Sequence, residues 1–196
     1  MSARWAGLVS VVVSCAAAAE GQWVTARGRL VPETRLEVWG GARTVGVGAV
    51  KPNAEATAAW AAELAYAFTD RVVELRAARV WQFTRSRFAT ASANLGTSLF
   101  VVPVGFNLGL GPNAGLTLSL GGKAVSVDLG LQSGVDLFIF EAAPRLPQRA
   151  LVGVTVRVRD FTLSVMARTG VDLVLGHPFV FRGDFMVSLG WLAPAS

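Results

Sequence analysis

The chain has 196 residues, of which 53% are hydrophobic, and its formal net charge is +5. Its mean hydropathy of +0.49 is high for a water-soluble protein of one-domain length. Beyond the N-terminal region, no stretch reaches the roughly 18 uninterrupted apolar residues of a transmembrane helix, so the apolar content indicates strands. The positive charge comes mainly from scattered arginines, a pattern that argues against nucleic-acid binding.

The first nineteen residues resemble a secretory signal peptide. A basic start is followed by the apolar run from Trp5 to Val13 and by an A-x-A site at Ala17 to Ala19. We therefore expect residues 1–19 to be removed during export. The alternative is lipid attachment at Cys15, the only cysteine, which follows a "VVS" sequence resembling a lipobox. In either case the mature chain has no disulfide. Residues 20–34 carry no pattern that assigns them a role.

From residue 56 to 69, large apolar side chains alternate with small or charged ones. Trp60, Leu64, Tyr66 and Phe68 fall on even positions, whereas Glu63 falls on an odd position. Because the side chains of a strand alternate between two faces, this pattern predicts a strand with one large apolar face.

The alternation continues along the segments 73–84, 99–110, 150–159, 161–175 and 179–191. In each segment the large apolar residues share one parity, and small or charged residues occupy the other. Arg79 is a misfit on the apolar parity of its segment. The first strand, between residues 35 and 50, is poorly defined because Gly40-Gly41 interrupts its alternation.

Turn composition predicts how these strands connect. Residues 69–71, 111–114 and 159–161 read as tight turns, and residues 51–55, 85–93 and 141–148 as longer loops, with the short turns gathered at one end. Gly121-Gly122-Lys123 is either a bulge in one long strand or a further turn, so the chain has eight or ten strands. Eight is favoured, because ten would leave segments shorter than the roughly 9–11 residues that a membrane-spanning strand needs.

Parity alone does not say which face is inside. In a soluble barrel or sandwich the apolar face would form the core and the polar face would meet water. Here the polar parity carries mostly Gly, Ala, Ser and Thr with isolated charges, and Lys51 and Lys123 are the only lysines. A solvated face would be rich in Lys and Glu, whereas small residues with a few charges fit the interior of a narrow barrel. The sequence therefore predicts an apolar face that meets lipid.

Aromatic residues gather near the predicted strand ends, as in the two interfacial girdles of membrane barrels. One predicted girdle lies beside one set of turns and contains Tyr66, Phe68, Phe106, Phe161 and Trp191. The other lies at the opposite strand ends and contains Trp60, Trp81, Phe83, Phe100, Phe179 and Phe181.

With this alternation, these girdles and these turns, residues 35–192 resemble the small bacterial outer-membrane β-barrels of the OmpA/OmpX type. The resemblance is one of class. It implies an all-β, antiparallel up-and-down transmembrane β-barrel in the outer membrane. Such a barrel is expected to be a monomer and to contact outer-membrane lipid and the barrel-insertion machinery. Such barrels often end at an aromatic residue, whereas here Trp191 is followed by "LAPAS", and residues 193–196 form a C-terminal tail.

Inward charges are expected to pair, because an isolated charge inside a narrow barrel costs several kcal/mol. One reading is an ion-pair network that plugs the lumen, and the other is a charged constriction that selects small solutes. The predicted members are Glu63, Glu74, Arg76, Arg157, Arg159, Arg168, Asp172, Arg182 and Asp184.

Signals for catalysis are weak. His177, the only histidine, lies in the "GHPF" connection, and no nucleophile or carboxylate can be placed beside it from sequence. No motif for a metal, phosphate or other cofactor is present in the sequence. We therefore expect a non-enzymatic structural or interaction module. The alternatives are a narrow pore in the same fold, a lipid-modifying enzyme centred on His177, and a soluble lipocalin-like carrier.

Overall fold

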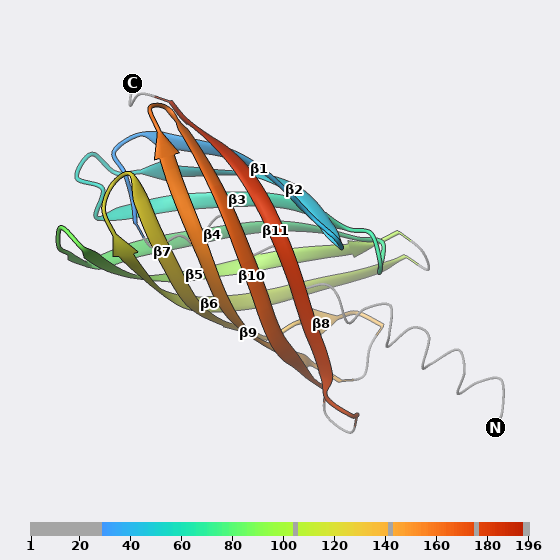
Figure 1. Cartoon of the computed structure of the whole chain (residues 1–196). Helices are drawn as coiled ribbons and strands as arrows, with labels where there is room; N and C mark the ends of the chain where they lie inside the picture. Colours follow the sequence, from blue (N-terminus) through green and yellow to red (C-terminus); the bar gives the residue numbers. More distant parts are fainter. Residues whose placement is uncertain (1–28, 104–105, 141–142, 175–176, 194–196) are drawn as a thin grey trace, which may run out of the picture.

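The computed structural model describes residues 29–103, 106–140, 143–174 and 177–193, which form a closed antiparallel β-barrel (Figure 1). The predicted signal peptide, Cys15 and all but the first residue of the C-terminal tail lie outside these ranges. None of the described residues forms a helix long and apolar enough to cross a membrane. The strands are β1 (Thr34–Gly41), β2 (Thr44–Pro52), β3 (Ala58–Ala67), β4 (Val72–Arg85), β5 (Ala89–Val102), β6 (Asn107–Gly121), β7 (Val125–Gly134), β8 (Leu137–Phe138), β9 (Arg145–Val158), β10 (Phe161–Val174) and β11 (Val180–Ala193).

Apart from the short β8, each strand pairs with its neighbours along the chain, and β1 closes the barrel by pairing with β11. The sheet formed by the described residues has eleven strands. The short β8 pairs with β6 beyond the end of β7, so it extends the line of β7 and the other ten strands form the wall. The predicted all-β antiparallel barrel is confirmed, and the favoured count of eight strands is wrong.

The two ends of the barrel carry different parts of the chain. The "terminal end" carries Arg29, the end of β11, and the β2–β3, β4–β5, β6–β7 and β9–β10 turns. The "far end" carries the β1–β2, β3–β4, β5–β6 and β10–β11 connections and the segment from β8 to β9. In Figure 1 the terminal end lies at the upper left.

One strand was missed near the N-terminus. Gly40 and Gly41 do not interrupt a single strand but end β1, and Ala42 and Arg43 turn the chain into β2. Two strands therefore occupy the region where the alternation predicts one.

The second error concerns residues 111–114, which lie within β6 rather than in a turn. The glycines of this strand reflect packing: a Cβ on Gly109 would lie 2.7 Å from the ring of Phe138, and one on Gly111 would lie 3.1 Å from that of Phe100. Inside a sheet, glycine often marks such a close approach. The reversal lies instead at residues 122–124, after Gly121 with its φ of +118°.

The predicted separation of short turns at one end is also wrong. The tight turns at residues 69–71 and 159–160 lie at the far and terminal ends, respectively. The predicted loop 85–93 shrinks to residues 86–88, since β4 runs to Arg85 and β5 begins at Ala89. The second half of the predicted loop 141–148 lies in β9, which begins at Arg145.

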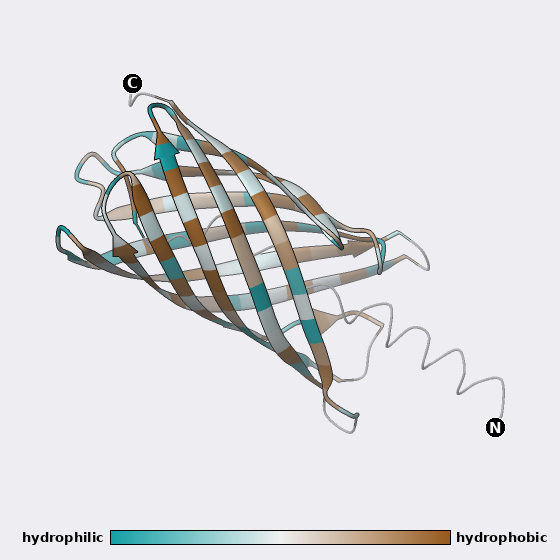
Figure 2. Ribbon diagram, viewed as in Figure 1, coloured by the Kyte–Doolittle hydropathy of each residue, from teal (hydrophilic) through white to brown (hydrophobic). Residues whose placement is uncertain are grey.

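The predicted facing is confirmed for most strands, but it is wrong at the end of β5, where Phe100 and Val102 lie inside the barrel. Large apolar side chains such as Leu64, Leu75, Val154 and Leu163 are exposed on the outer wall, whereas charged residues such as Arg76 are buried inside. Figure 2 shows the resulting alternation of hydrophobic and hydrophilic residues along the front strands β7, β9, β10 and β11. A soluble protein buries its apolar side chains and exposes its charged ones, whereas this barrel exposes large apolar side chains and buries charged ones.

An apolar cluster shares the interior with the charges. Trp39 is 3% exposed and belongs to a buried cluster with Met166 and Met186. Its indole lies over Gly46, where an added Cβ would be 2.4 Å from Trp39 Cζ2. Gly40, on the same hairpin, has no atom within 4 Å of the corresponding position.

Replacing Gly46 by Ala is therefore expected to displace Trp39 and lower the free energy of unfolding by about 1–3 kcal/mol, the usual range for overpacking. Urea unfolding in lipid vesicles, followed by tryptophan fluorescence, measures the change. The matched variant Gly40→Ala should unfold at or slightly above the wild-type urea concentration. Equal midpoints for the two variants would show that Trp39 does not constrain this hairpin.

Candidate functional site

The buried charges inside the far half of the barrel form the candidate site. Arg76 on β4 is 1% exposed. Its guanidinium lies 3.4 Å from Glu63 Oε1 and donates to Asn94 Oδ1 at 2.9 Å. It also donates to Asn113 Oδ1 on β6, at 2.9 Å from Nε. One arginine thus joins residues from four neighbouring strands, β3 to β6.

Glu74 belongs to the same group of side chains. Ser98 Oγ donates to Glu74 Oε1 at 2.6 Å, and Asn113 Nδ2 donates to Ser98 Oγ at 3.1 Å. The amide of Asn113 therefore links the two carboxylates, because its oxygen accepts from Arg76 while its nitrogen donates towards Glu74 through Ser98.

Asp172 on β10 is the centre of a second group. Its side chain is fully buried, and it pairs with Arg149 on β9 and with Arg182 on β11. Arg182 Nε lies 3.3 Å from Asp172 Oδ2, and Arg182 NH1 lies 3.8 Å from Asp70 Oδ2 in the β3–β4 turn. Arg182 therefore connects walls that are separated by β1 and β2 in the sheet.

Asp70 lies outside the strands, in the far-end turn. Burial raises the pKa of its carboxyl group above the ordinary value, and the nearby guanidinium of Arg182 opposes this rise. Arg145 and Arg43 also act to lower this pKa, but burial outweighs the nearby cations and the pKa of Asp70 remains raised.

The other predicted interior charges have different positions. Arg168 is buried and lies opposite Asp184 in the β10–β11 register. Asp184 Oδ2 accepts a hydrogen bond of 3.0 Å from Thr44 Oγ1 on β2. Arg157 lies at the terminal mouth, where it pairs with Glu33 at 2.9 Å. Arg159 is not inside: it is exposed in the β9–β10 turn with a φ of 52°, because its strand ends at Val158.

Several buried charged residues were not predicted. Arg145 falls in the predicted loop 141–148, and Arg149 lies between this loop and the strand predicted from residue 150, but both share the inward parity of Gly153 in β9. The Arg145 guanidinium lies 5.2 Å from the ring centroid of Phe138. The alternation, extended back through the prolines, would have found both arginines. The other unpredicted buried charges among the described residues are Arg35, Glu37, Asp70, Asp128 and Asp136.

A chain of hydroxyl groups surrounds Asp128 in the terminal half. Ser119 Oγ donates to Asp128 Oδ1, and Thr155 Oγ1 donates to Asp128 Oδ2 at 2.9 Å. Ser164 Oγ in turn donates to Thr155 Oγ1 at 2.8 Å. These bonds connect β6, β7, β9 and β10 from inside the wall. Hydroxyl donors thus stabilise this buried carboxylate.

Residues 29–33 lie against the mouth at the terminal end. Arg29 donates to the Gly121 carbonyl at 3.0 Å, and the Leu30 amide donates to Gln82 Oε1 at 3.1 Å. The Leu30 side chain is 4% exposed. Partial burial acts to raise the pKa of Glu33, but the hydrogen bond and charge of Arg157, a backbone hydrogen bond and the charge of Lys123 together outweigh it, so the pKa is lowered. The segment is thereby attached to three different strands.

Aromatic side chains are exposed near both ends of the outer wall, but the predicted membership needs correction. Phe161 and Trp191 lie at the terminal end with Trp60, Trp81 and Phe83. Phe179 and Phe181 lie at the far end with Tyr66, Phe68 and Phe106. Phe100 belongs to neither group, because it is 1% exposed inside the barrel and stacks on Phe138 at 5.6 Å.

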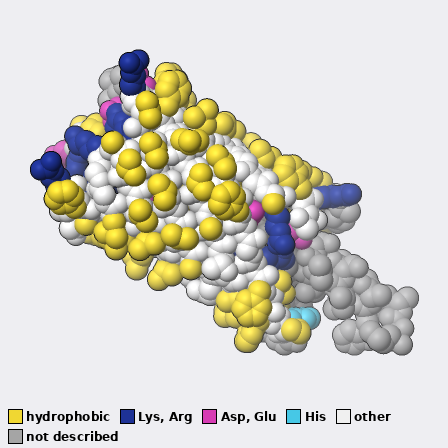
Figure 3. All heavy atoms as spheres, in the orientation of Figure 1, with side chains coloured by type: hydrophobic (Ala, Val, Ile, Leu, Met, Phe, Trp, Pro, Cys, Tyr) yellow, Lys and Arg dark blue, Asp and Glu magenta, His cyan; other side chains and the backbone are white. Residues whose placement is uncertain are grey.

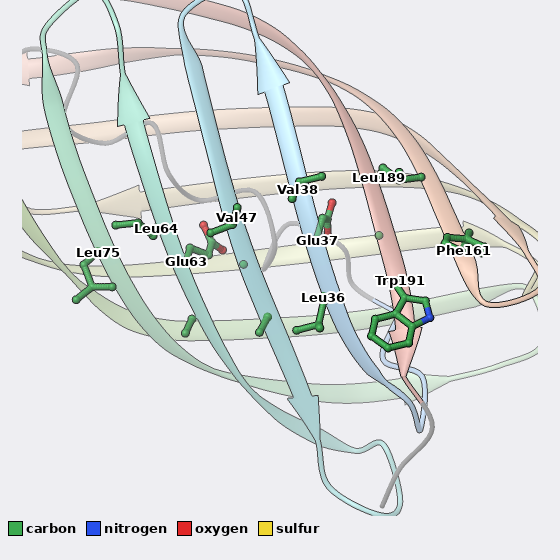
Figure 4. A pocket seen from close by; sticks show the side chains of 14 residues that line it. Leu36, Glu37, Val38, Val47, Glu63, Leu64, Leu75, Phe161, Leu189 and Trp191 are labelled. Carbon is green, nitrogen blue, oxygen red and sulfur yellow. The ribbon is translucent and has the colours of Figure 1, made fainter.

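A shallow groove of about 570 Å³ crosses the outer wall over β1, β2, β3 and β11 (Figure 4). Leu64, Leu75 and Trp191 are among the large side chains that border it, and Ala49 and Ala62 leave room between them. Glu37 and Glu63 are also among the lining residues, but both are buried on the inner side of the wall. The groove is an apolar depression in an apolar wall.

His177 is exposed in the far-end connection, and its backbone N–H donates to the Val174 carbonyl at 3.0 Å. Within the described ranges, no group of three or more His, Cys, Asp or Glu residues could hold a metal ion. The described surroundings of His177 thus supply no observation that favours catalysis there.

No protein-family model matches the chain, and no curated protein matches it in sequence. The resemblance to OmpA/OmpX-type barrels therefore extends to the closed antiparallel barrel and no further.

Proposed function

We propose that the protein is an integral outer-membrane β-barrel that acts as a structural or interaction module without enzymatic activity. The observation that carries this proposal is the continuous exposure of large apolar side chains around a closed wall whose interior is charged. Leaving one such side chain in water rather than burying it costs about 1.5–3 kcal/mol, and soluble monomers rarely expose apolar patches of more than a few hundred Å². A lipid environment removes this cost.

The ends of the barrel support the same proposal. Exposed aromatic residues border the apolar wall at both ends, as the amphipathic rings of Trp and Tyr do at membrane interfaces. In bacterial barrels of this class the C-terminal strand ends in the periplasm, so we propose that the terminal end is periplasmic and that the loop of His177 faces outward.

We further propose that the lumen is closed rather than conducting. Arg182 reaches Asp70 across the far half, and Leu30 is buried at the terminal mouth. Side chains that cross the interior and pair there leave less room for a hydrated solute. A structural role for the charged network fits this arrangement better than a selective constriction does.

Cell fractionation followed by gel migration tests the proposal. The chain should be recovered in the outer membrane, and the detergent-solubilised protein should migrate differently before and after boiling, as folded barrels do. Recovery of a folded chain from the periplasm without detergent would contradict it and favour a soluble carrier. Steady ion conductance in planar bilayers would replace the closed lumen with a narrow pore in the same membrane fold.

A further inference from the structure

A groove of about 1210 Å³ lies at the terminal end, between residues 29–33 and three hairpin turns. These turns join β4 to β5, β6 to β7, and β9 to β10, and they are neighbours because the strands between them are paired. Figure 3 shows basic side chains gathered at this end, at the upper left of the view.

The residues that line the groove carry a large excess of positive charge. Six of them are basic, namely Arg29, Arg85, Arg87, Lys123, Arg157 and Arg159. The lining contains one carboxylate, that of Glu33, which already pairs with Arg157. The groove is therefore suited to an anion with more than one negative oxygen.

Hydrogen bonds hold several of these cations in place without neutralising them. Arg29 donates to the Gly121 carbonyl at 3.0 Å, and Arg85 donates to the Glu55 carbonyl at 3.3 Å. Arg157 Nε donates to the Arg159 carbonyl at 3.1 Å. A backbone carbonyl is uncharged, so these contacts orient the guanidinium groups without compensating their charge. The charges of Arg29 and Arg85 thus stay available to a ligand, whereas Arg157 also pairs with Glu33.

The outer edge of the groove is apolar. Phe88 and Val125 line it, and their side chains are 68% and 50% exposed. The Arg87 guanidinium lies 5.4 Å from the centroid of the Phe88 ring. Val127 continues the apolar surface along β7 on the outer wall. A ligand here would therefore meet cations and apolar side chains side by side.

We propose that this groove binds the headgroup phosphate of an anionic phospholipid from the membrane leaflet at the terminal end. Its acyl chains would lie along Phe88, Val125 and the adjoining wall. An acidic peptide or a nucleic acid would match the charge but has no acyl chain for this edge. The inference rests on the proposed membrane insertion, because it needs the apolar wall to be in lipid.

The double variant Arg87→Gln/Lys123→Gln tests the site. Both side chains are exposed at the tips of turns, so their replacement leaves the buried network intact. The matched control is Arg43→Gln/Arg71→Gln, which removes two cations from the far-end turns. Native mass spectrometry of the refolded full chain in neutral detergent measures its binding of phosphatidylglycerol, phosphatidylcholine and inorganic phosphate.

The wild-type chain and the far-end control should prefer phosphatidylglycerol to phosphatidylcholine. The groove variant should lose most of this preference, by about 25-fold if each basic residue contributes about fivefold near an anionic lipid surface. Equal losses in both variants would overturn the site, as would the lack of any preference in the wild type. Displacement of phosphatidylglycerol by an equal concentration of inorganic phosphate would assign the groove to free phosphate instead.

Gel migration of the same samples separates the two proposals. A sample that shows the heat-dependent shift of a folded barrel but no lipid preference refutes the phospholipid site alone. A detergent-solubilised sample without that shift refutes the membrane barrel on which the site depends.

Discussion

Asp172→Asn is expected to destabilise the barrel by about 3–5 kcal/mol, because removal of one partner of a buried ion pair leaves an uncompensated charge. Asp172 is fully buried and pairs with both Arg149 and Arg182. Its neutralisation takes from Arg149 and Arg182 the carboxylate that they share, and Asp70 remains 3.8 Å from Arg182. Urea unfolding of the refolded protein in lipid vesicles measures the loss.

The control for this change is Asp160→Asn, in the exposed β9–β10 turn, which should alter the free energy of unfolding by less than about 0.5 kcal/mol. Adding Arg149→Met to Asp172→Asn should recover part of the stability, because it removes one of the unpaired cations. If Asp172→Asn unfolds at the wild-type urea concentration, water reaches this carboxylate. The interior would then be open enough to conduct, and the closed lumen would be wrong.

Val154→Arg on the outer wall is expected to cost about 2–4 kcal/mol if the side chain lies near the membrane midplane. Val154 is 43% exposed and faces Val127 on β7 and Val165 on β10 in the sheet register. The charge would have to stay in the hydrocarbon layer or distort the lipid around it. Unfolding in vesicles of defined composition measures the cost.

Ala54→Arg, in the exposed β2–β3 turn, is the matched control and should be nearly neutral. Equal tolerance of arginine at residues 54 and 154 would show that the wall does not meet lipid. A third variant, Thr155→Arg, changes the next residue of β9 and places the new charge inside the barrel, beside the hydroxyl groups around Asp128. Its effect on the free energy of unfolding should not depend on lipid composition.

The alternation of side chains along a strand is local, which explains what could be predicted from the sequence. Val152 and Val154 lie outside and Gly153 lies inside because successive side chains point to opposite faces. The shortage of lysine and the small residues on the polar parity then indicated which face was inside. The all-β barrel and its inverted facing follow from these features.

The parity of residue numbers assigns a side chain to the wrong face where a turn goes unrecognised. Phe100, Phe106 and Leu108 share even numbers, but the turn after β5 resets the relation between number and face. Phe100 therefore lies inside, while Leu108 lies on the outer parity of β6. The "GPNA" sequence of residues 111–114 resembles a turn, although Gly111 accommodates the ring of Phe100 inside the barrel. The error in strand number has another origin: Gly40-Gly41 end β1 where one strand was predicted, and a turn after Gly121 separates β6 from β7 where a bulge was favoured.

The tertiary structure was needed to show which of the interior charges form ion pairs with one another. The sequence by itself determined that Asp172 and Arg182 face inward, since that follows from residue type and period. Only the closed barrel decided that Arg182 reaches Asp70 and that Arg149 pairs with Asp172. The physical reason is that facing is a property of one strand, whereas pairing across a lumen depends on the number of strands, their relative stagger and the closure of β1 on β11.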